Sequence, residues 1–490
     1  MTTNLTNLVK SLRDIMRSDP GINGDAQRIE QIAWLLFLKV YAAKEEEWEI
    51  DMDDYQSVIP EKYRWQNWAV DDGSGSARTG DELLTFVDEM FAVLKSLPVT
   101  SEMEKKKQVV RSVFEDTNQY MKNGVLLRQV VNLIAAIDLT SYENIHALGA
   151  IYETILKELQ SAGKAGEFYT PRAVTDFMAE MVHPRLGERM ADFACGTGGF
   201  LVSYLEQIAS ARQTPEDFAA YSRAVYGIEK KQFPYELAIT NLLLHDVDEP
   251  NIIHGNSLAK NVLNYTEKDQ FDVILMNPPY GGSELPAIQQ NFPEDLRDSE
   301  TADLFMSVIL YRLRADGRAA VVLPDGFLFG TEGTKRNIKE RLMDTCNLHT
   351  VIRLPASVFS PYTSITTNLL FFDKTGPTEK TWFYRLDMPA GYKHFSKTKP
   401  MRREHFDPVR TWWTHREEIE EGGTPKAKCY SREEIAAGGY SLDLCGYPHE
   451  SETILPPLAL IQSYQEERQK LTADIDATLE EIRAALEAKA

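Results

Sequence analysis

Seven short apolar runs alternate with helix-forming stretches between residues 166 and 372, and this alternation limits the possible fold more than any other feature. Each run is four to six residues long, which is the usual length of a buried strand. The runs are residues 189–193, 224–228, 251–254, 271–276, 318–323, 349–354 and 367–372. Strands separated by helices form a mostly parallel sheet, because parallel neighbours need crossover connections. The pattern therefore predicts a doubly wound α/β domain.

The region before this domain is predicted to be helical. Apolar residues recur at helical spacing in four stretches, which are residues 5–16, 25–40, 126–138 and 144–159. The run from residue 44 to residue 54 carries seven acidic residues, and we expect it to be a solvated helix end and loop. The chain thus begins with a predicted all-helical domain.

The end of the chain carries one apolar stripe on a predicted helix. The stripe consists of Tyr464, Leu471, Ile475, Leu479, Ile482 and Leu486. An amphipathic helix at a chain end must bury its stripe, either against its own domain or against a partner helix. We predict a helical domain over residues 1–150, the α/β domain over residues 151–450 and a helix for subunit contact over residues 451–490.

The charge of the chain is strongly acidic, with 53 Lys and Arg against 74 Asp and Glu and a net charge of −21. A protein that binds DNA alone needs clustered cations to neutralise phosphates. Either nucleic acid is not the substrate, or a basic patch is local, or another subunit brings the DNA. One basic cluster suits phosphate contacts, although such a cluster is more often a solvated loop: Lys393, Lys397, Lys399, Arg402 and Arg403.

Several functional classes are disfavoured. No run of eighteen apolar residues occurs, so no membrane span is expected. The N-terminus lacks the layout of a signal peptide, which predicts a cytoplasmic protein. The four cysteines share no CxxC spacing, so we expect no metal site.

Asn277, Pro278, Pro279 and Tyr280 directly follow the fourth predicted strand. Two consecutive prolines end a strand, so these residues lie at its carboxyl end, where open α/β sheets bind ligands. An amide oxygen, a proline carbonyl and an aromatic ring suit a planar base with an exocyclic amino group. The alternative is a simple turn that ends a strand. Residues 281–301, which are polar and rich in Gly and Pro, are predicted to form a mobile active-site loop.

A glycine-rich turn follows the first predicted strand. Asp192 precedes Gly196, Thr197, Gly198 and Gly199, and a helix is predicted to start there. The spacing differs from that of dinucleotide-binding turns, and an acid before the glycines suits an ammonium group better than a pyrophosphate. This favours S-adenosylmethionine over NAD as the cofactor. Taken alone, glycines are common in any turn between a strand and a helix.

Two polar residues follow the next two strands. Glu229 ends the second strand, where a carboxylate accepts the hydroxyl groups of a ribose. The alternative for Glu229 is a surface ion pair with Lys230 or Lys231. Asn256 follows the third strand and is within reach of an adenine ring in this arrangement.

The segment of residues 166–172 precedes the α/β pattern. Thr170 as N-cap and Pro171 at the first helical position predict a helix start. Phe168 and Tyr169 stand just before it and are available to line a pocket beside the glycine turn. The alternative is a helix start without a binding role.

The acid–glycine turn, the ribose acid and Asn-Pro-Pro-Tyr follow three strands in ascending order. In this order the chain resembles amino-methyltransferases of the Rossmann-like class. More closely, it resembles the modification (methyltransferase) subunit of type I restriction-modification systems, and nearly the whole chain takes part in the resemblance. The segments that carry it are residues 163–172, 191–200, 226–231, 271–282, 301–305, 317–330 and 354–372.

The resemblance implies methyl transfer from S-adenosylmethionine to the N6 amino group of a flipped-out adenine in double-stranded DNA, in a complex that protects host DNA. It implies that Glu167, Phe168, Tyr169, Thr170, Pro171 and Arg172 belong to the cofactor site. It also implies a specificity subunit that binds two methyltransferase subunits, and a restriction nuclease subunit. No metal is required for this chemistry.

Two other functions fit parts of the sequence. The amino group of a glutamine side chain or of an RNA base also suits Asn-Pro-Pro-Tyr, although the helical domain and the tail disfavour both substrates. A non-catalytic scaffold that binds S-adenosylmethionine is the alternative from another class. The intact motif and glycine turn disfavour the scaffold.

Overall fold

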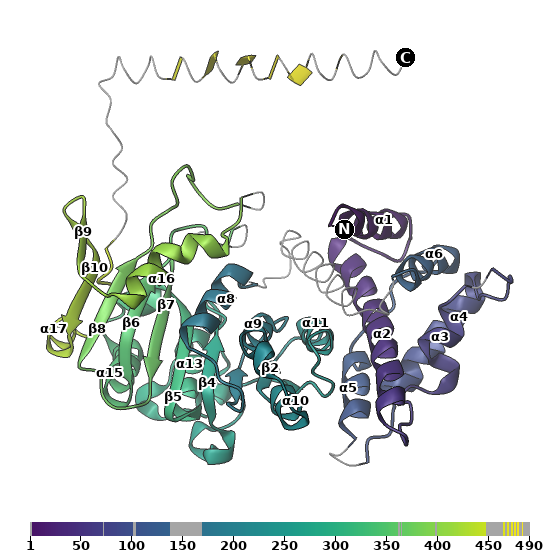
Figure 1. The fold of residues 1–490 in the computed structure, drawn as a ribbon, viewed down its shortest axis with the longest axis horizontal. Coiled ribbons are helices and arrows are strands. Elements are labelled where there is room, and N and C mark those ends of the chain that lie inside the picture. The colour runs from purple at the N-terminus through teal and green to yellow at the C-terminus, as the bar shows by residue number, and fades with distance from the viewer. Residues whose placement is uncertain are drawn as a thin grey trace. The chain divides into compact units, whose positions relative to one another are not determined.

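A ten-stranded sheet forms the core of the α/β region in a computed structural model (Figure 1). The structure describes residues 2–71, 73–100, 104–137, 169–360, 363, 365–396 and 399–446, with scattered helical positions between 464 and 483. The strands are β1 (Met190–Asp192), β2 (Val225–Glu229), β3 (Ile252–His254), β4 (Phe271–Met276), β5 (Leu313–Pro324), β6 (Asn347–Arg353), β7 (Thr367–Asp373), β8 (Lys380–Arg385), β9 (Ile419–Glu421) and β10 (Thr424–Ser431).

The sheet is parallel in its first half and mixed in its second. The strand order is β3-β2-β1-β4-β5-β7-β6-β8-β10-β9, and the first five strands of this order all run parallel. β7 runs antiparallel to both β5 and β6, and the described residues between β6 and β7 include no crossover helix of the kind that a parallel pair needs. All seven predicted strands are present, so the prediction of a doubly wound α/β domain is confirmed. β8, β9 and β10 were not predicted.

Each face of the sheet packs against its own group of helices, as the alternation along β4 illustrates. Val273 and Leu275 belong to one hydrophobic core, whereas Ile274 and Met276 belong to a second one. The first core includes α8 (Arg172–Met181), α9 (Gly199–Ile208), α10 (Pro215–Ser222), α11 (Gln232–Leu243) and α16 (Asp407–Thr414). The second includes α13 (Thr301–Arg312), α14 (Asp325–Phe329), α15 (Gly333–Thr345) and α17 (Arg432–Ala437). A run that is buried on both faces is therefore continuously apolar.

The N-terminal region is helical, as predicted. Its helices are α1 (Thr2–Arg17), α2 (Asp25–Asp51), α3 (Trp65–Trp68), α4 (Gly80–Lys95), α5 (Lys105–Phe114) and α6 (Gly124–Ala135). The predicted helix over residues 144–159 lies outside the described residues.

Short 3-10 helices occur in both regions of the chain. They are η1 (Glu61–Tyr63), η2 (Ala209–Ala211), η3 (Val262–Asn264), η4 (Glu267–Asp269), η5 (Glu294–Leu296) and η6 (Arg403–Phe406).

The acidic run of residues 44–54 forms the end of α2 and the loop after it, as expected, and most of its acidic residues are exposed, but one of them is buried. α2 continues to Asp51, and Glu45 is only 1% exposed. The Glu45 carboxylate accepts hydrogen bonds from Tyr55 Oη (2.9 Å), Ser57 Oγ (2.8 Å) and the Val58 amide (3.1 Å). The chain after α2 folds back and supplies the donors that a buried carboxylate needs.

The helical region contacts the α/β region through α11. Gln232 Nε2 donates to the carbonyls of Ser112 (2.9 Å) and Val113 (2.8 Å), just before the end of α5. Residues up to Gly446 form one contact unit, and residues 447–490 form a second. The domain boundaries near residues 150 and 450 stay predictions.

The second unit contains the predicted tail helix, and its described positions between residues 464 and 483 are helical. Tyr464, Ile475 and Leu479 are exposed there by 68%, 58% and 57%. The other members of the predicted stripe, Leu471, Ile482 and Leu486, lie outside the described side chains.

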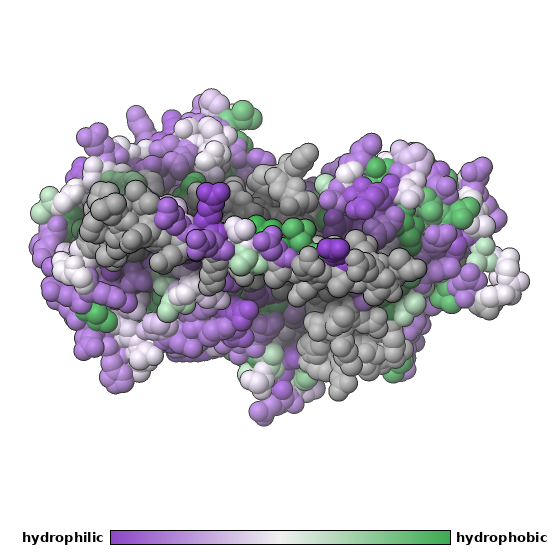
Figure 2. Space-filling model, turned by 90° about the horizontal axis from the view of Figure 1, so that it is seen from above, coloured by the Kyte–Doolittle hydropathy of each residue, from purple (hydrophilic) through white to green (hydrophobic). Residues whose placement is uncertain are grey.

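The face of the molecule drawn in Figure 2 is covered mainly by hydrophilic residues, with small and separate hydrophobic patches. Within the described ranges, no helix is long and apolar enough to span a membrane.

A buried carboxyl group on α11 gives a prediction about stability. Glu236 is buried where α11 meets the helical region, and Thr117 Oγ1 donates to it (3.2 Å). Burial raises the pKa of Glu236 to about 8, Thr117 lowers it and nearby Glu30 raises it. The folded state therefore keeps a proton that the unfolded chain releases near its ordinary pKa of 4.5. Stability should fall as the pH rises from about 4.5 to 8, by an amount on the order of a few kcal/mol.

Glu236→Gln should remove this dependence, because the amide has a similar shape and no charge to bury. We expect the variant to gain stability over the natural chain progressively between pH 5 and pH 8 in thermal unfolding. Glu216→Gln, on α10, is the control and should show a constant difference. A stability gap for Glu236→Gln that does not grow with pH would contradict the assignment.

Candidate functional site

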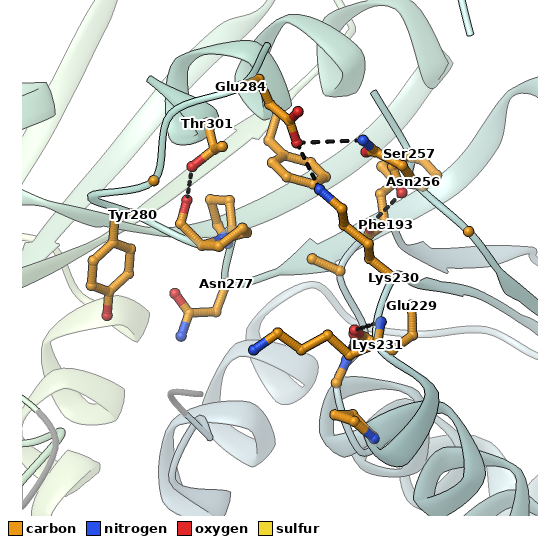
Figure 3. A pocket seen from close by; sticks show the side chains of 18 of the residues that line it. Phe193, Glu229, Lys230, Lys231, Asn256, Ser257, Asn277, Tyr280, Glu284 and Thr301 are labelled. Carbon is orange, nitrogen blue, oxygen red and sulfur yellow. Dashed lines mark hydrogen bonds and ion pairs between the residues drawn. The ribbon is translucent and has the colours of Figure 1, made fainter. Parts of the chain in front are cut away.

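A cavity of about 340 Å³ opens where β1, β2, β3 and β4 end (Figure 3). These strands are parallel, so their carboxyl ends meet at one edge of the sheet. Several predicted site residues line the cavity: Tyr169, Gly196, Glu229, Asn256, Asn277, Pro278, Pro279 and Tyr280. Its volume falls in the range of small-molecule sites.

The side-chain amide of Asn277 has a hydrogen-bond partner at its nitrogen but none among the described residues at its oxygen. Its Nδ2 donates to Thr170 Oγ1 at 3.0 Å, which fixes the orientation of the amide. Its Oδ1 is buried and accepts no hydrogen bond from any residue that the structure describes. Leaving a buried acceptor unsatisfied costs about 1–3 kcal/mol, so such an atom marks a place where a ligand donor fits.

The turn that carries Asn277 is rigid. Thr301 Oγ1, at the start of α13, donates to the Pro279 carbonyl at 2.7 Å (Figure 3). The two prolines fix two further backbone angles. Tyr280 is half-buried, and burial raises the pKa of its hydroxyl to about 12, against a lowering by neighbouring Asn277. A neutral aromatic ring therefore stands beside the open amide oxygen.

Glu229 and the glycine turn form one structural unit. The Gly196 amide donates to Glu229 Oε2 (2.9 Å), and the Lys231 amide donates to Oε1 (2.8 Å). Gly196 has a φ of +54°, and a Cβ atom added to it would meet nothing within 4 Å. A side chain there would be strained and would project into the cavity. The turn therefore leaves space for a ligand directly beside the carboxylate.

Asp192 stabilises the glycine turn through a hydrogen bond and does not line the cavity. It is 1% exposed, and its Oδ1 accepts from the Ala194 amide at 3.0 Å. Burial raises the pKa of Asp192 to about 8, and nearby Glu229 raises it further, whereas the Ala194 amide lowers it. Its role in cofactor binding stays a prediction.

The other glycine-turn residues lie behind the cavity wall. Asn241 Nδ2, on α11, donates to the Thr197 carbonyl at 3.0 Å. Gly198 has a φ of +80° and is the N-cap of α9, which begins at Gly199. These residues shape the turn and contribute no lining.

The segment before α8 ties the glycine turn to Asn277. Tyr169 lines the cavity, Thr170 holds Asn277, and Arg172 Nη1 donates to the Gly199 carbonyl at 2.8 Å. The predicted helix start was wrong by one residue, because Pro171 is the N-cap of α8 and the Thr170 hydroxyl serves Asn277. Glu167 and Phe168 lie outside the described residues.

Sequence reasoning missed Glu284, which bridges two sides of the cavity. Glu284 Oε1 accepts from Lys230 Nζ (3.1 Å) and from Asn256 Nδ2 (3.4 Å) (Figure 3). Lys230 follows β2 and Asn256 follows β3, so this bridge joins both strand ends to the segment of residues 281–301. Other unpredicted lining residues include Lys231, Pro234, Ser257, Thr301 and Phe305. The Lys231 side chain extends across the cavity toward Asn277 (Figure 3).

The segment of residues 281–301 is anchored at several points. It contains α12 (Pro286–Gln289), and Phe292 and Leu296 are buried in the second core. The mobility expected of this segment stays a prediction.

Other chemistries find little support in the described ranges. No group of three His, Cys, Asp or Glu residues there is placed to hold a metal ion. Burial raises the pKa of the Cys195 thiol well above its ordinary value, so the cysteine nearest the glycine turn is a poor nucleophile.

Two family models match the chain. The N-6 DNA Methylase model matches residues 143–454, and the HsdM N-terminal domain model matches residues 5–134. The methylase subunit of the type I restriction enzyme EcoEI from Escherichia coli is 46% identical over 473 residues, which are 95% of each chain.

Solved structures agree with these matches. The modification subunit of a putative type I restriction enzyme from Vibrio vulnificus is 41% identical, with a TM-score of 0.79, over 89% of this chain and 93% of that one. A chain from a structural study of assembly and conformational transition in a type I restriction-modification system is 34% identical, also with a TM-score of 0.79. That similarity covers 98% of both chains.

Proposed function

The chain belongs to the methylase subunits of type I restriction enzymes, and from this premise we propose that it transfers a methyl group from S-adenosylmethionine to the N6 amino group of adenine in DNA. The observation that carries this proposal is the buried, unsatisfied Asn277 Oδ1 at the mouth of the cavity. An acceptor in that position suits the N–H group of a base better than any other group on a nucleotide.

The cavity suits the proposed cofactor. Gly196 leaves room beside Glu229, and the carboxylate retains acceptor capacity for ribose hydroxyls beyond its two backbone bonds. Asn256 would contact the adenine ring, and Tyr169 would lie against the cofactor near Asn277. S-adenosylmethionine supplies an electrophilic methyl group when it is bound.

The amino group of adenine is a weak nucleophile, because its lone pair is delocalised into the ring. We assign Asn277 Oδ1 and the Pro278 carbonyl as acceptors for its two N–H groups, which draws electron density to the nitrogen. Thr170 and Thr301 hold this turn in place before the base arrives. Preorganised dipoles of this kind supply a large share of catalysis.

The base cannot reach this cavity while it is stacked in a duplex, so it must be flipped out. Tyr280 is placed to stack on its face, and Pro279 would complete the rim. The remaining members of the proposed cofactor site are Glu167, Phe168, Pro171, Arg172, Asp192, Thr197, Gly198 and Gly199.

The chain is a member of a type I restriction-modification complex by family. We propose that two copies of it bind one specificity subunit on double-stranded DNA, with a restriction nuclease subunit in the full complex. The net charge of −21 supports a separate subunit that binds DNA, because the acidic chain alone is poorly suited to bind DNA phosphates. We also propose that it works in the cytoplasm, where the host DNA lies.

Methyl transfer tests the proposal directly. The chain should be produced with the specificity subunit encoded beside it, incubated with labelled S-adenosylmethionine and DNA, and the methylated positions mapped. We expect N6-methyladenine at one sequence. Cofactor binding without any transfer would instead support a non-catalytic scaffold.

Glu229→Gln tests the ribose contact. Glutamine keeps one side-chain oxygen but loses the charge and one acceptor, so we expect S-adenosylmethionine to bind about tenfold more weakly, or about 1.4 kcal/mol. Calorimetric titration of the assembled complex measures this, with Glu216→Gln as the control. An unchanged dissociation constant would show that the carboxylate serves only the glycine turn.

A further inference from the structure

The segment of residues 388–403 has a charge unlike that of the rest of the chain. It contains five Lys or Arg residues, one His and no acidic residue, in a chain with a net charge of −21. Its described cations are Lys393, Lys399, Arg402 and Arg403, and all four residues are exposed. We call these four residues the basic surface.

The basic surface emerges from the same edge of the sheet as the cavity. β8 is parallel to β6, with Arg385 opposite Arg353, and both β5 and β6 are antiparallel to β7. β5 is parallel to β4, so β8 and β4 end at the same edge. The basic surface therefore begins after Arg385 at the edge where Asn277 follows β4.

One helix links the basic surface to the cavity. Phe406 stacks on Phe177 of α8, with ring centroids 4.1 Å apart and planes 6° apart, and Arg403 Nε lies 3.5 Å from Asp176 Oδ2. Thr170, which holds Asn277, stands just before the same helix. Asp176 lies about 6 Å along the helix axis from Arg172, the first residue of α8, and Thr170 stands two residues before Arg172.

Apolar residues near the basic surface are buried while its own side chains are exposed. Phe395, Met401 and Phe406 are buried, and the Phe395 amide donates to Ser357 Oγ at 2.8 Å. Lys393 and Lys399 form no ion pair with a residue that the structure describes, and Arg402 reaches only exposed Glu404, at 3.7 Å. Arg403 is paired with Asp176, whereas Lys393, Lys399 and Arg402 have no close acidic partner among the described residues, and exposed cations of this kind suit an external polyanion.

Another basic run in the chain behaves differently. Lys105 and Lys106 lie 3.9 Å and 3.7 Å from Glu249 carboxylate oxygens, and Lys107 lies 2.8 Å from Glu104. This run is neutralised within the chain. Lys105 and Lys106 line a hollow with Arg189 and Asn251, which precede β1 and β3 at the opposite edge of the sheet.

We propose that the basic surface contacts DNA phosphates beside the flipped-out adenine, an inference that rests on the proposed function. A duplex that delivers a base to Asn277 must cross this edge of the sheet, and duplex DNA carries one charge per about 1.7 Å of its axis. Arg403, which meets α8 at Asp176, is therefore within a few nucleotides of a base extruded to Asn277, at about 3.4 Å per nucleotide of one strand. The contact positions the strand and reads no sequence.

The test is a salt titration of DNA binding by the complex with the specificity subunit. The duplex should carry the methylated sequence found by mapping, and the variant should combine Lys393→Gln, Lys399→Gln and Arg402→Gln. Each lost phosphate contact lowers the slope of log K against log salt by about 0.9, so we expect the slope to fall by about two to three. Affinity at 0.15 M salt should fall at least about tenfold.

The matched control combines Lys105→Gln, Lys268→Gln and Arg314→Gln. It removes the same charge from residues at the start of α5, before β4 and near the start of β5, away from the cavity edge, and should leave the slope unchanged. S-adenosylmethionine binding should be equal in all three complexes.

Equal slopes for the basic-surface variant and the control would overturn the proposal. Weaker assembly with the specificity subunit at an unchanged slope would also overturn it, and would assign the surface to a protein partner. If the natural complex binds DNA but transfers no methyl group, the proposed function fails, and the slopes still decide whether this surface contacts phosphates.

Discussion

Asn277→Ala should lower the rate of methyl transfer at least about 10³-fold, or about 4 kcal/mol in the activation barrier. The substitution removes a buried side-chain amide oxygen that faces the cavity and accepts no hydrogen bond from the described residues. It leaves Glu229 and its bonds to the Gly196 and Lys231 amides intact. The dissociation constant for S-adenosylmethionine should therefore change less than about threefold, which separates catalysis from cofactor binding.

Single-turnover transfer of a labelled methyl group to saturating DNA measures the chemical step, and calorimetry measures cofactor binding. Asn264→Ala removes an exposed amide at the end of η3 and serves as the control. Near-normal transfer by Asn277→Ala would refute the assignment of Oδ1 as the acceptor. Loss of cofactor binding together with activity would instead mean that the amide is part of the cofactor site.

Removal of residues 457–490 should weaken binding to the specificity subunit at least about 100-fold, or about 2.8 kcal/mol, with little change in folding. Residues 447–490 form a contact unit of their own, and residues 1–446 form another. Tyr464, Ile475 and Leu479 are more than half exposed, and burying each large apolar side chain contributes about 1.5–3 kcal/mol. The melting temperature of the isolated chain should shift by less than about 2 °C.

A sharper version keeps the full chain and combines Tyr464→Glu, Ile475→Glu and Leu479→Glu. The matched control places the same three charges at Gln465, Gln469 and Thr472, which the structure describes on the same helix. Sedimentation of each chain with the specificity subunit gives the fraction assembled. Equal assembly for both variants would show that the apolar stripe does not mediate the contact.

The strands that carry the cavity were predictable because burial on both faces makes them continuously apolar. β4 matches its predicted residues 271–276 at both ends. The strands after β7 were missed for the opposite reason. β10 is only partly buried at nearly every position, and β8 mixes Lys380 and Arg385 with aromatic residues, so neither gives a clear apolar run.

The site residues at strand ends were predictable for a topological reason. Parallel strands bring their carboxyl ends together, so Glu229, Asn256 and Asn277 converge although nearly fifty residues separate the first from the last. Glu284 was not predictable, because its place depends on how a segment without regular strands folds back toward Lys230. For Asp192, the predicted position at the end of β1 is correct. Its side chain, however, accepts a hydrogen bond from the Ala194 amide within the turn and does not line the cavity.

The placement of Thr170 and Phe177 on either side of the start of α8 has an evolutionary consequence. Each residue inserted into an α-helix shifts the later turns by about 1.5 Å along the axis and rotates them by roughly 100°. A single insertion between these positions would turn the Phe177 ring away from Phe406 while leaving Thr170 on Asn277. Substitutions along this stretch are tolerable wherever they face solvent, but changes of its length are not. The number of residues between Thr170 and Phe177 should therefore stay constant among related chains. Insertions and deletions should accumulate in the surrounding loops instead.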